Sequence, residues 1–162
     1  MTGCTPRPLA DRAAPRRGNW LRLWLPVIAW MVLIFIASAD SDSNARGSRI
    51  LGPLLRWLIP DISPFLLERT IFHVRKLVHF VTFGVLAALL WRALAAAHPG
   101  RWSPRTAWTA IGVTALYAVS DELHQSLTPS RVASAWDVVI DTAGAAFTVA
   151  AIWRVGRWLR RW

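Results

Sequence analysis

Ionisable side chains that could take part in chemistry cluster between residues 121 and 141, and two more, Lys76 and His79, lie earlier in the sequence. Carboxylate and imidazole groups held close together can act as general acid and base. The candidate catalytic residues are Lys76, His79, Asp121, Glu122 and His124. The candidate ligand-binding residues are Gln125, Arg131, Asp137 and Asp141. The lysine and the arginine would suit an anionic group, such as the phosphate of a lipid-linked precursor.

Metal binding and nucleophilic catalysis are less well supported. His79 and His124, with nearby carboxylates, are ligand types for zinc or another divalent ion. The H-E-x-x-H spacing is absent, however, and Lys76 and Arg131 would repel a cation. The sequence therefore assigns no metal and no cofactor. Gly-x-Ser-x-Gly and P-loop motifs are also absent, which argues against acyl-serine and nucleotide chemistry. Cys4 is the only cysteine, so a disulfide within the chain is excluded.

Apolar segments must position these groups. Hydrophobic residues make up 54% of the chain. Four apolar runs have about the 20 residues needed to cross a bilayer core; they cover about 20–38, 74–97, 106–125 and 136–155. The last begins near Asp137 and Asp141 and is the weakest by hydropathy. We therefore predict an all-α polytopic membrane protein with a four-transmembrane-helix bundle.

The connection between the first two runs is long and partly apolar. Ser63 followed by Pro64 is typical of a helix start. A helix running unbroken from there to Ala97 would be about 50 Å long, which exceeds a bilayer core of about 30 Å. We therefore expect a separate amphipathic segment on the outer membrane surface that leads into the second span.

The net charge of +10 is distributed unevenly. Segments before the first run, around the second turn and after the fourth run hold twelve basic residues and one acid, whereas the other side holds seven basic residues and eight acids. The positive-inside rule then places both termini in the cytoplasm. The division is a basic tail at 1–18, a membrane domain at 19–155 and a second basic tail at 156–162. The charge indicates a lipid bilayer as partner and argues against nucleic acid.

A secretory signal peptide is the alternative interpretation of the first run. Ala37-Ser38-Ala39 has the A-x-A pattern of a cleavage site and follows an arginine-rich start. The apolar run is longer than a usual signal core and contains Pro26 and several tryptophans. We therefore favour a retained span.

Topology and helical spacing bring the polar groups together. The start of the second span, the end of the third and the start of the fourth lie on the same, outer side. Lys76 and His79 share one helix face, as do Asp121 and His124. Small residues follow Asp141 on its face and allow close helix packing: Gly144, Ala145 and Thr148. We expect one polar pocket, although the charges could instead serve only to pair the helices.

The motifs resemble the VanZ-like family of small bacterial membrane proteins. They are Lys76-x-x-His79-Phe80, Asp121-Glu122-x-His124-Gln125, Pro129-x-Arg131 and Asp137-x-x-x-Asp141-x-x-Gly144. The likeness covers about 36–148. The chain departs from the pattern at Ser130, where Gly is frequent, at Phe83, where Tyr is common, and at Thr148, near a second Gly. The resemblance implies a bacterial cell-membrane protein, in a family named for a member linked to lowered teicoplanin susceptibility; it implies no mechanism.

Three classes of function fit these features. The favoured one is a cell-envelope protein that binds or modifies an anionic, lipid-linked component at an outward-facing site. A non-enzymatic scaffold or partner-binding protein, whose charges only pair the helices, is the main alternative. A proton-coupled transporter fits less well, because the chain is small. The sequence leaves open the substrate, the oligomeric state and whether the protein is an enzyme.

Overall fold

A computed structural model describes residues 17–39, 43–97, 99–127 and 134–162. These residues contain five helices and no strand, which confirms the predicted all-α fold. The helices are α1 (Arg17–Ala39), α2 (Ser43–Leu58), α3 (Pro64–Ala95), α4 (Pro104–Ser126) and α5 (Ala135–Trp158).

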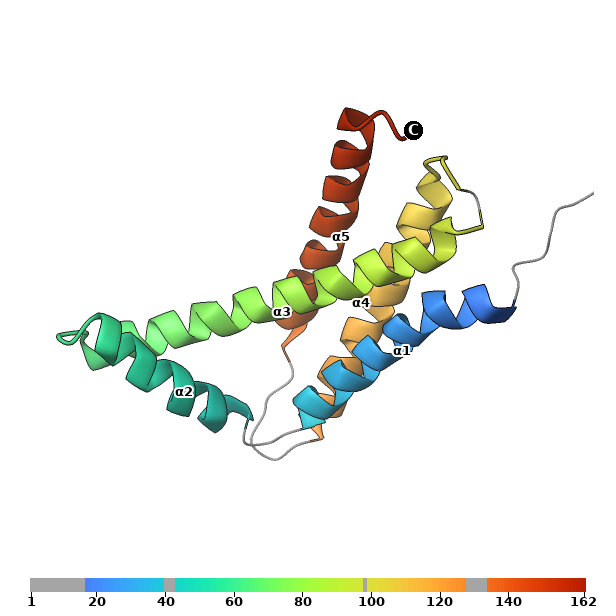
Figure 1. The fold of residues 1–162 in the computed structure, drawn as a ribbon. Coiled ribbons are helices and arrows are strands. Elements are labelled where there is room, and N and C mark those ends of the chain that lie inside the picture. The colour runs from blue at the N-terminus through green and yellow to red at the C-terminus, as the bar shows by residue number, and fades with distance from the viewer. Residues whose placement is uncertain (1–16, 40–42, 98, 128–133) are drawn as a thin grey trace, which may run out of the picture.

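Helix α3 is the centre of the fold, because it contacts each of the other four helices. Figure 1 shows α2 folded back along its N-terminal half, with α1 and α4 alongside its C-terminal half and α5 crossing it. The predicted helix start is confirmed: Ser63 Oγ accepts a hydrogen bond from the Leu66 amide, and Pro64 occupies the first turn. Ser103 and Pro104 start α4 in the same way.

The prediction of a break before the second span is wrong. Helix α3 continues for 32 residues from Pro64, a length of about 48 Å. No proline interrupts it after its first turn, and Ile71 and Leu67 in its N-terminal half are buried. The amphipathic segment is instead the separate helix α2. It packs on α3, so α2 and part of α3 form a helical hairpin.

Within the part of the chain that the structure describes, three helices are long and apolar enough to cross a membrane: α1 over Trp20–Ser38, α3 and α5. Helix α4, with 23 residues, is long enough, but its mean hydropathy is lower than that of these three helices. The expectation that 136–155 is the weakest span is therefore wrong. Serine and threonine residues along α4, with Asp121 and Glu122 near its end, lower its hydropathy more than Asp137 and Asp141 lower that of α5.

The small residues of α5 make a close helix contact, as predicted, and the partner helix is α3. A Cβ added to Gly144 would overlap the backbone carbonyl of Phe80. One turn further along α5, Thr148 lies against Gly84, where a Cβ would come within 2.5 Å of the threonine Oγ1. Ala145 is fully buried beside them. This contact fixes the register of α5 on α3, which decides where Asp141 lies.

Large apolar side chains cover the outside of the helices. Trp108 and Leu116 on α4 are each 72% exposed, and Phe147 on α5 is 65% exposed. Soluble monomers rarely expose contiguous apolar surface of this kind, whereas a surface in contact with lipid requires it.

Candidate functional site

The first polar contact joins α3 and α5. His79 Nδ1 lies 3.6 Å from Asp141 Oδ1, beyond ordinary hydrogen-bond length. Asp141 is 3% exposed, and neither of these two atoms has a hydrogen-bond partner among the described residues. The pair is positioned by the small-residue contact described above, since Phe80 follows His79 and Gly144 lies one turn after Asp141. The imidazole ring also stacks on Phe83, with centroids 6.4 Å apart.

A second contact joins α1 and α4. Ser38 Oγ donates a hydrogen bond of 2.9 Å to Asp121 Oδ2, and Gln125 Nε2 donates to the same oxygen at 2.8 Å. Gln125 Nε2 also lies 3.2 Å from Ser38 Oγ, so the three side chains form a closed triangle. All three are buried. The other carboxylate oxygen of Asp121 is buried and has no hydrogen-bond partner in the part of the chain that the structure describes.

Two further contacts hold helices or helix ends together. Lys76 forms an ion pair with Asp137, which again joins α3 to α5, and its ammonium lies 5.2 Å from the Phe72 ring centroid. Glu122 accepts a hydrogen bond from the backbone amide of Ser134, just before α5 begins. The first contact pins two helices, and the second ties the end of α4 to the start of α5.

His124 faces α1. Its ring stacks on Phe35, with centroids 4.3 Å apart. Its Nδ1 atom is buried and lacks a hydrogen-bond partner among the described residues. The two histidines therefore have different surroundings: His79 lies against a carboxylate, and His124 lies against an aromatic ring.

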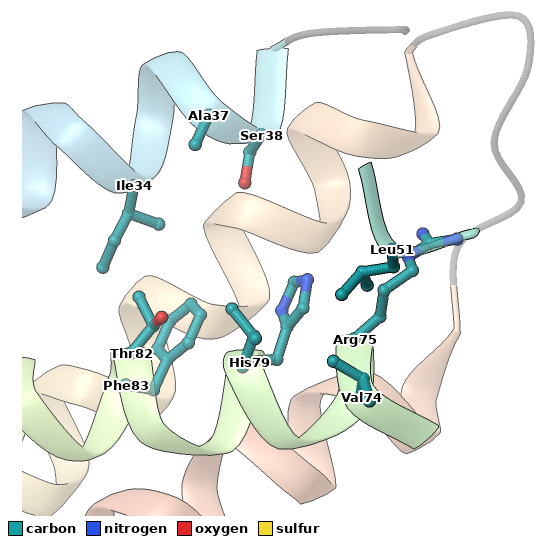
Figure 2. Close-up of a pocket in the computed structure, with 10 residues that line it drawn as sticks. Ile34, Ala37, Ser38, Leu51, Val74, Arg75, His79, Thr82 and Phe83 are labelled. Atoms are coloured by element: carbon teal, nitrogen blue, oxygen red, sulfur yellow. The ribbon is translucent and has the colours of Figure 1, made fainter. Parts of the chain in front are cut away.

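A pocket of about 280 Å³ opens beside His79. Its walls come from α1, α2 and α3, and Figure 2 shows Ser38 and His79 pointing into it from α1 and α3. Most of the lining is apolar, whereas four residues supply polar atoms: Ser38, Arg75, His79 and Thr82. The pocket is therefore amphipathic, with a histidine and an arginine on one wall.

The structure separates the predicted residues into a lining group and a supporting group. Of the described candidates, His79 lines the pocket. Asp141 lies behind His79, and Asp121 with Gln125 lies behind Ser38. Arg131 falls outside the described residues. That the candidates share one pocket remains a prediction.

Sequence reasoning missed three lining residues: Ser38, Arg75 and Thr82. Arg75, His79 and Thr82 follow the i, i+4, i+7 spacing of one helix face, so that signal was available for two of them. Ser38 forms side-chain hydrogen bonds with residues 83 and 87 positions away, and no local pattern names them.

A model of the VanZ/LLP1 family matches residues 23–157. The chain belongs to the VanZ/LLP1 family. The predicted family is thus confirmed over most of the sequence. No curated protein and no solved structure gives a significant match to the chain.

The VanZ/LLP1 site does not form a metal centre from its described residues. No three histidine, cysteine or carboxylate side chains among them lie close enough together to hold an ion. The described residues of the site can take part in hydrogen bonding, charge interactions and proton transfer. A histidine that turns Nδ1 toward a carboxylate has Nε2 left for a second partner, and such a histidine can bind an anion or move a proton.

Proposed function

We propose that this VanZ/LLP1 protein is a multi-pass protein of the bacterial cell membrane that binds an anionic, lipid-linked component of the cell envelope. The observation that carries the proposal is the amphipathic pocket between α1, α2 and α3. Its apolar lining suits a hydrocarbon chain, while Arg75 and His79 suit a phosphate or carboxylate. Because VanZ is linked to teicoplanin susceptibility, we extend the proposal to the response to glycopeptides.

The proposed topology has four spans, with both termini in the cytoplasm. Helix α4 is included because it packs on α1, α3 and α5 and is about 35 Å long. The uneven distribution of arginine supports the orientation, since basic residues collect on the cytoplasmic side. The pocket then lies near the outer surface, where envelope precursors are used.

Cysteine labelling tests this topology. In a Cys4→Ser background, single cysteines placed at 47, 101 and 160 are treated in whole cells with a reagent that does not cross the membrane. We expect labelling at 47 and none at 101 or 160 until the cells are opened. Labelling of 101 from outside would overturn the orientation.

Pocket variants test the binding function. Arg75→Gln removes a guanidinium and His79→Gln an imidazole from the pocket wall, whereas Arg56→Gln removes a guanidinium from α2 outside the pocket. Each variant is returned to a deletion strain, and the sensitivity to teicoplanin and other envelope antibiotics is measured together with the protein level. We expect the two pocket variants to behave like the deletion and Arg56→Gln to behave like the unchanged protein. Full function in both pocket variants would remove the proposal.

The scaffold function has its own support, because Lys76 with Asp137 and Glu122 with Ser134 hold helices together. If the polar groups only pair helices, function should fall in proportion to folding. The combined variant Asp121→Asn, His124→Gln and Lys76→Met separates the two functions. Activity that falls only as far as the protein level falls would favour the scaffold, whereas lost activity in a folded, abundant protein would favour ligand binding.

A further inference from the structure

Two hollows meet at Trp153, near the opposite end of α5 from the polar contacts. The first is an apolar groove of about 380 Å³ between α4 and α5, and its lining includes Trp108, Ile111, Ala146 and Ala150. The second is a hollow of about 560 Å³ whose lining includes Arg154, Arg157 and Trp158. Trp153 lines both. An apolar groove therefore leads directly to a cationic one.

Helical spacing places lining residues of both hollows along one stripe on a single face of α5. Ala146, Ala150, Trp153 and Arg157 follow the i, i+4, i+7, i+11 pattern of a single face. The guanidinium carbon of Arg157 lies 5.4 Å from the Trp153 ring centroid, so the arginine folds back over the end of the groove. Its charge is thus placed where the apolar lining stops.

We propose that this stripe is a binding site for an anionic phospholipid. One acyl chain lies in the α4–α5 groove, and the phosphate lies between Arg154 and Arg157. Guanidinium groups bind phosphate oxygens in pairs, and two arginines favour a headgroup with a net negative charge over a zwitterionic one, whose cation they would repel. Trp153 and Trp158 take the interfacial position that tryptophan prefers in membranes. The site shares with the proposed function only the placement in a membrane, because the α1–α3 pocket lies at the other end of the bundle.

Lipid titration of the purified full-length protein in a neutral detergent tests the site. Native mass spectrometry measures binding of phosphatidylglycerol, phosphatidylcholine and soluble glycerol 3-phosphate. We expect the unchanged protein to prefer phosphatidylglycerol. The double variant Arg154→Gln, Arg157→Gln should weaken that binding by about 30-fold, since each basic group near the surface contributes about 1 kcal/mol. Binding of phosphatidylcholine should not change.

Matched variants separate this site from general charge attraction. Arg105→Gln removes one positive charge at the same end of the bundle, outside both hollows, and should leave the affinity unchanged. Ala150→Trp fills the groove from an exposed position and should weaken binding of both lipids in a protein that still unfolds at its normal temperature. Three results would overturn the proposal: equal affinity for the two lipids, equal loss with Arg105→Gln, or glycerol 3-phosphate binding as tightly as the lipid.

Discussion

The two ends of the bundle are held together by different interactions. At the polar end, hydrogen bonds and ion pairs join the helices, as in Ser38 with Asp121. At the other end, the rings of Trp91, Trp102 and Trp162 lie 5.7 to 5.9 Å apart and close the space between α3, the α3–α4 turn and the end of the chain. At this end the exposed Arg92 also donates hydrogen bonds from Nη2 to the carbonyls of Arg22 and Leu23, so α3 and α1 are joined without a buried charge among the described residues. Buried charge at the polar end is therefore more than packing requires, which supports a binding role.

A reversal of the chain builds the aromatic end. Arg160 has a φ of 51°, in the left-handed region, and the Arg161 amide donates a hydrogen bond to the Gly156 carbonyl. This resembles the turn that commonly ends helices, with arginine in the place usually taken by glycine. It folds Trp162 back against Gly156. At the polar end Gly144 packs against the backbone of Phe80, whereas at the aromatic end Gly156 packs against the side chain of Trp162.

The largest difference between the two ends should come from alanine at these two glycines. Gly144→Ala places a methyl group against the Phe80 backbone, which cannot move without shifting α3. We expect a loss of about 3 kcal/mol in the free energy of unfolding, at the upper end for overpacked sites. The Trp162 ring that Gly156→Ala meets can move away only by giving up its contacts with Trp91 and Trp102; offset by the helix gain of about 0.5–1 kcal/mol, the change should cost about 1 kcal/mol. Unfolding in mixed detergent micelles measures both.

Gly112→Ala is the control for this comparison. Gly112 is exposed on α4, and an added Cβ there would meet no atom within 4 Å. Replacing a mid-helix glycine by alanine should stabilise the helix by about 0.5–1 kcal/mol. A Gly144→Ala protein as stable as Gly112→Ala would show that α3 and α5 do not approach as closely as described.

Removing the ring of Trp162 should have an intermediate effect. Trp162→Ala deletes two aromatic contacts, with Trp91 and Trp102. At about 0.5–1.5 kcal/mol for each pair, the expected loss is about 2 kcal/mol in the free energy of unfolding. Envelope-antibiotic sensitivity should stay that of the unchanged protein, because the pocket lies at the other end. Loss of function in a folded Trp162→Ala protein would mean that the two ends are coupled.

The smallest effect on stability should come with the largest effect on function. Asp141→Asn keeps the size of the side chain and removes the charge facing His79. Polar contacts between membrane helices contribute about 0.6 kcal/mol on average, so the free energy of unfolding should fall by about that amount. We expect function to be lost, because His79 loses the group that orients it.

A double-mutant cycle sharpens this last prediction. If Asp141 acts through His79, then His79→Gln and the combined variant should have the same functional defect as Asp141→Asn alone. Additive defects would show that Asp141 contributes separately from His79. The antibiotic-sensitivity assay and the protein level provide both measurements.

Local patterns were enough to predict most of the helical elements. Apolar runs and the Ser63-Pro64 start predicted the helices. The prediction that α3 breaks before the second span was wrong because it relied on bilayer thickness. That thickness limits the length of a span, but it does not end a helix whose extra turns pack on a neighbour such as α2.

Pairings between helices could not be predicted from the same patterns. Whether His79 meets Asp141 or Asp121 depends on how closely α3 and α5 approach at Gly144 and Phe80. Spacing within one helix does not determine that approach. For the same reason Ser38 and the pocket it lines were not identified, since α1, α2 and α3 form a pocket only when all three are packed.

Every polar side-chain pair described between helices joins the first half of the chain to the second. Ser38, Lys76 and His79 all precede residue 97, whereas Asp121, Gln125, Asp137 and Asp141 all follow residue 104. The pocket wall is thus made early in translation and the carboxylates that support it are made late. In the proposed topology, Lys76 and His79 enter the membrane before α5 supplies Asp137 and Asp141, and an ionisable group without a partner is costly there.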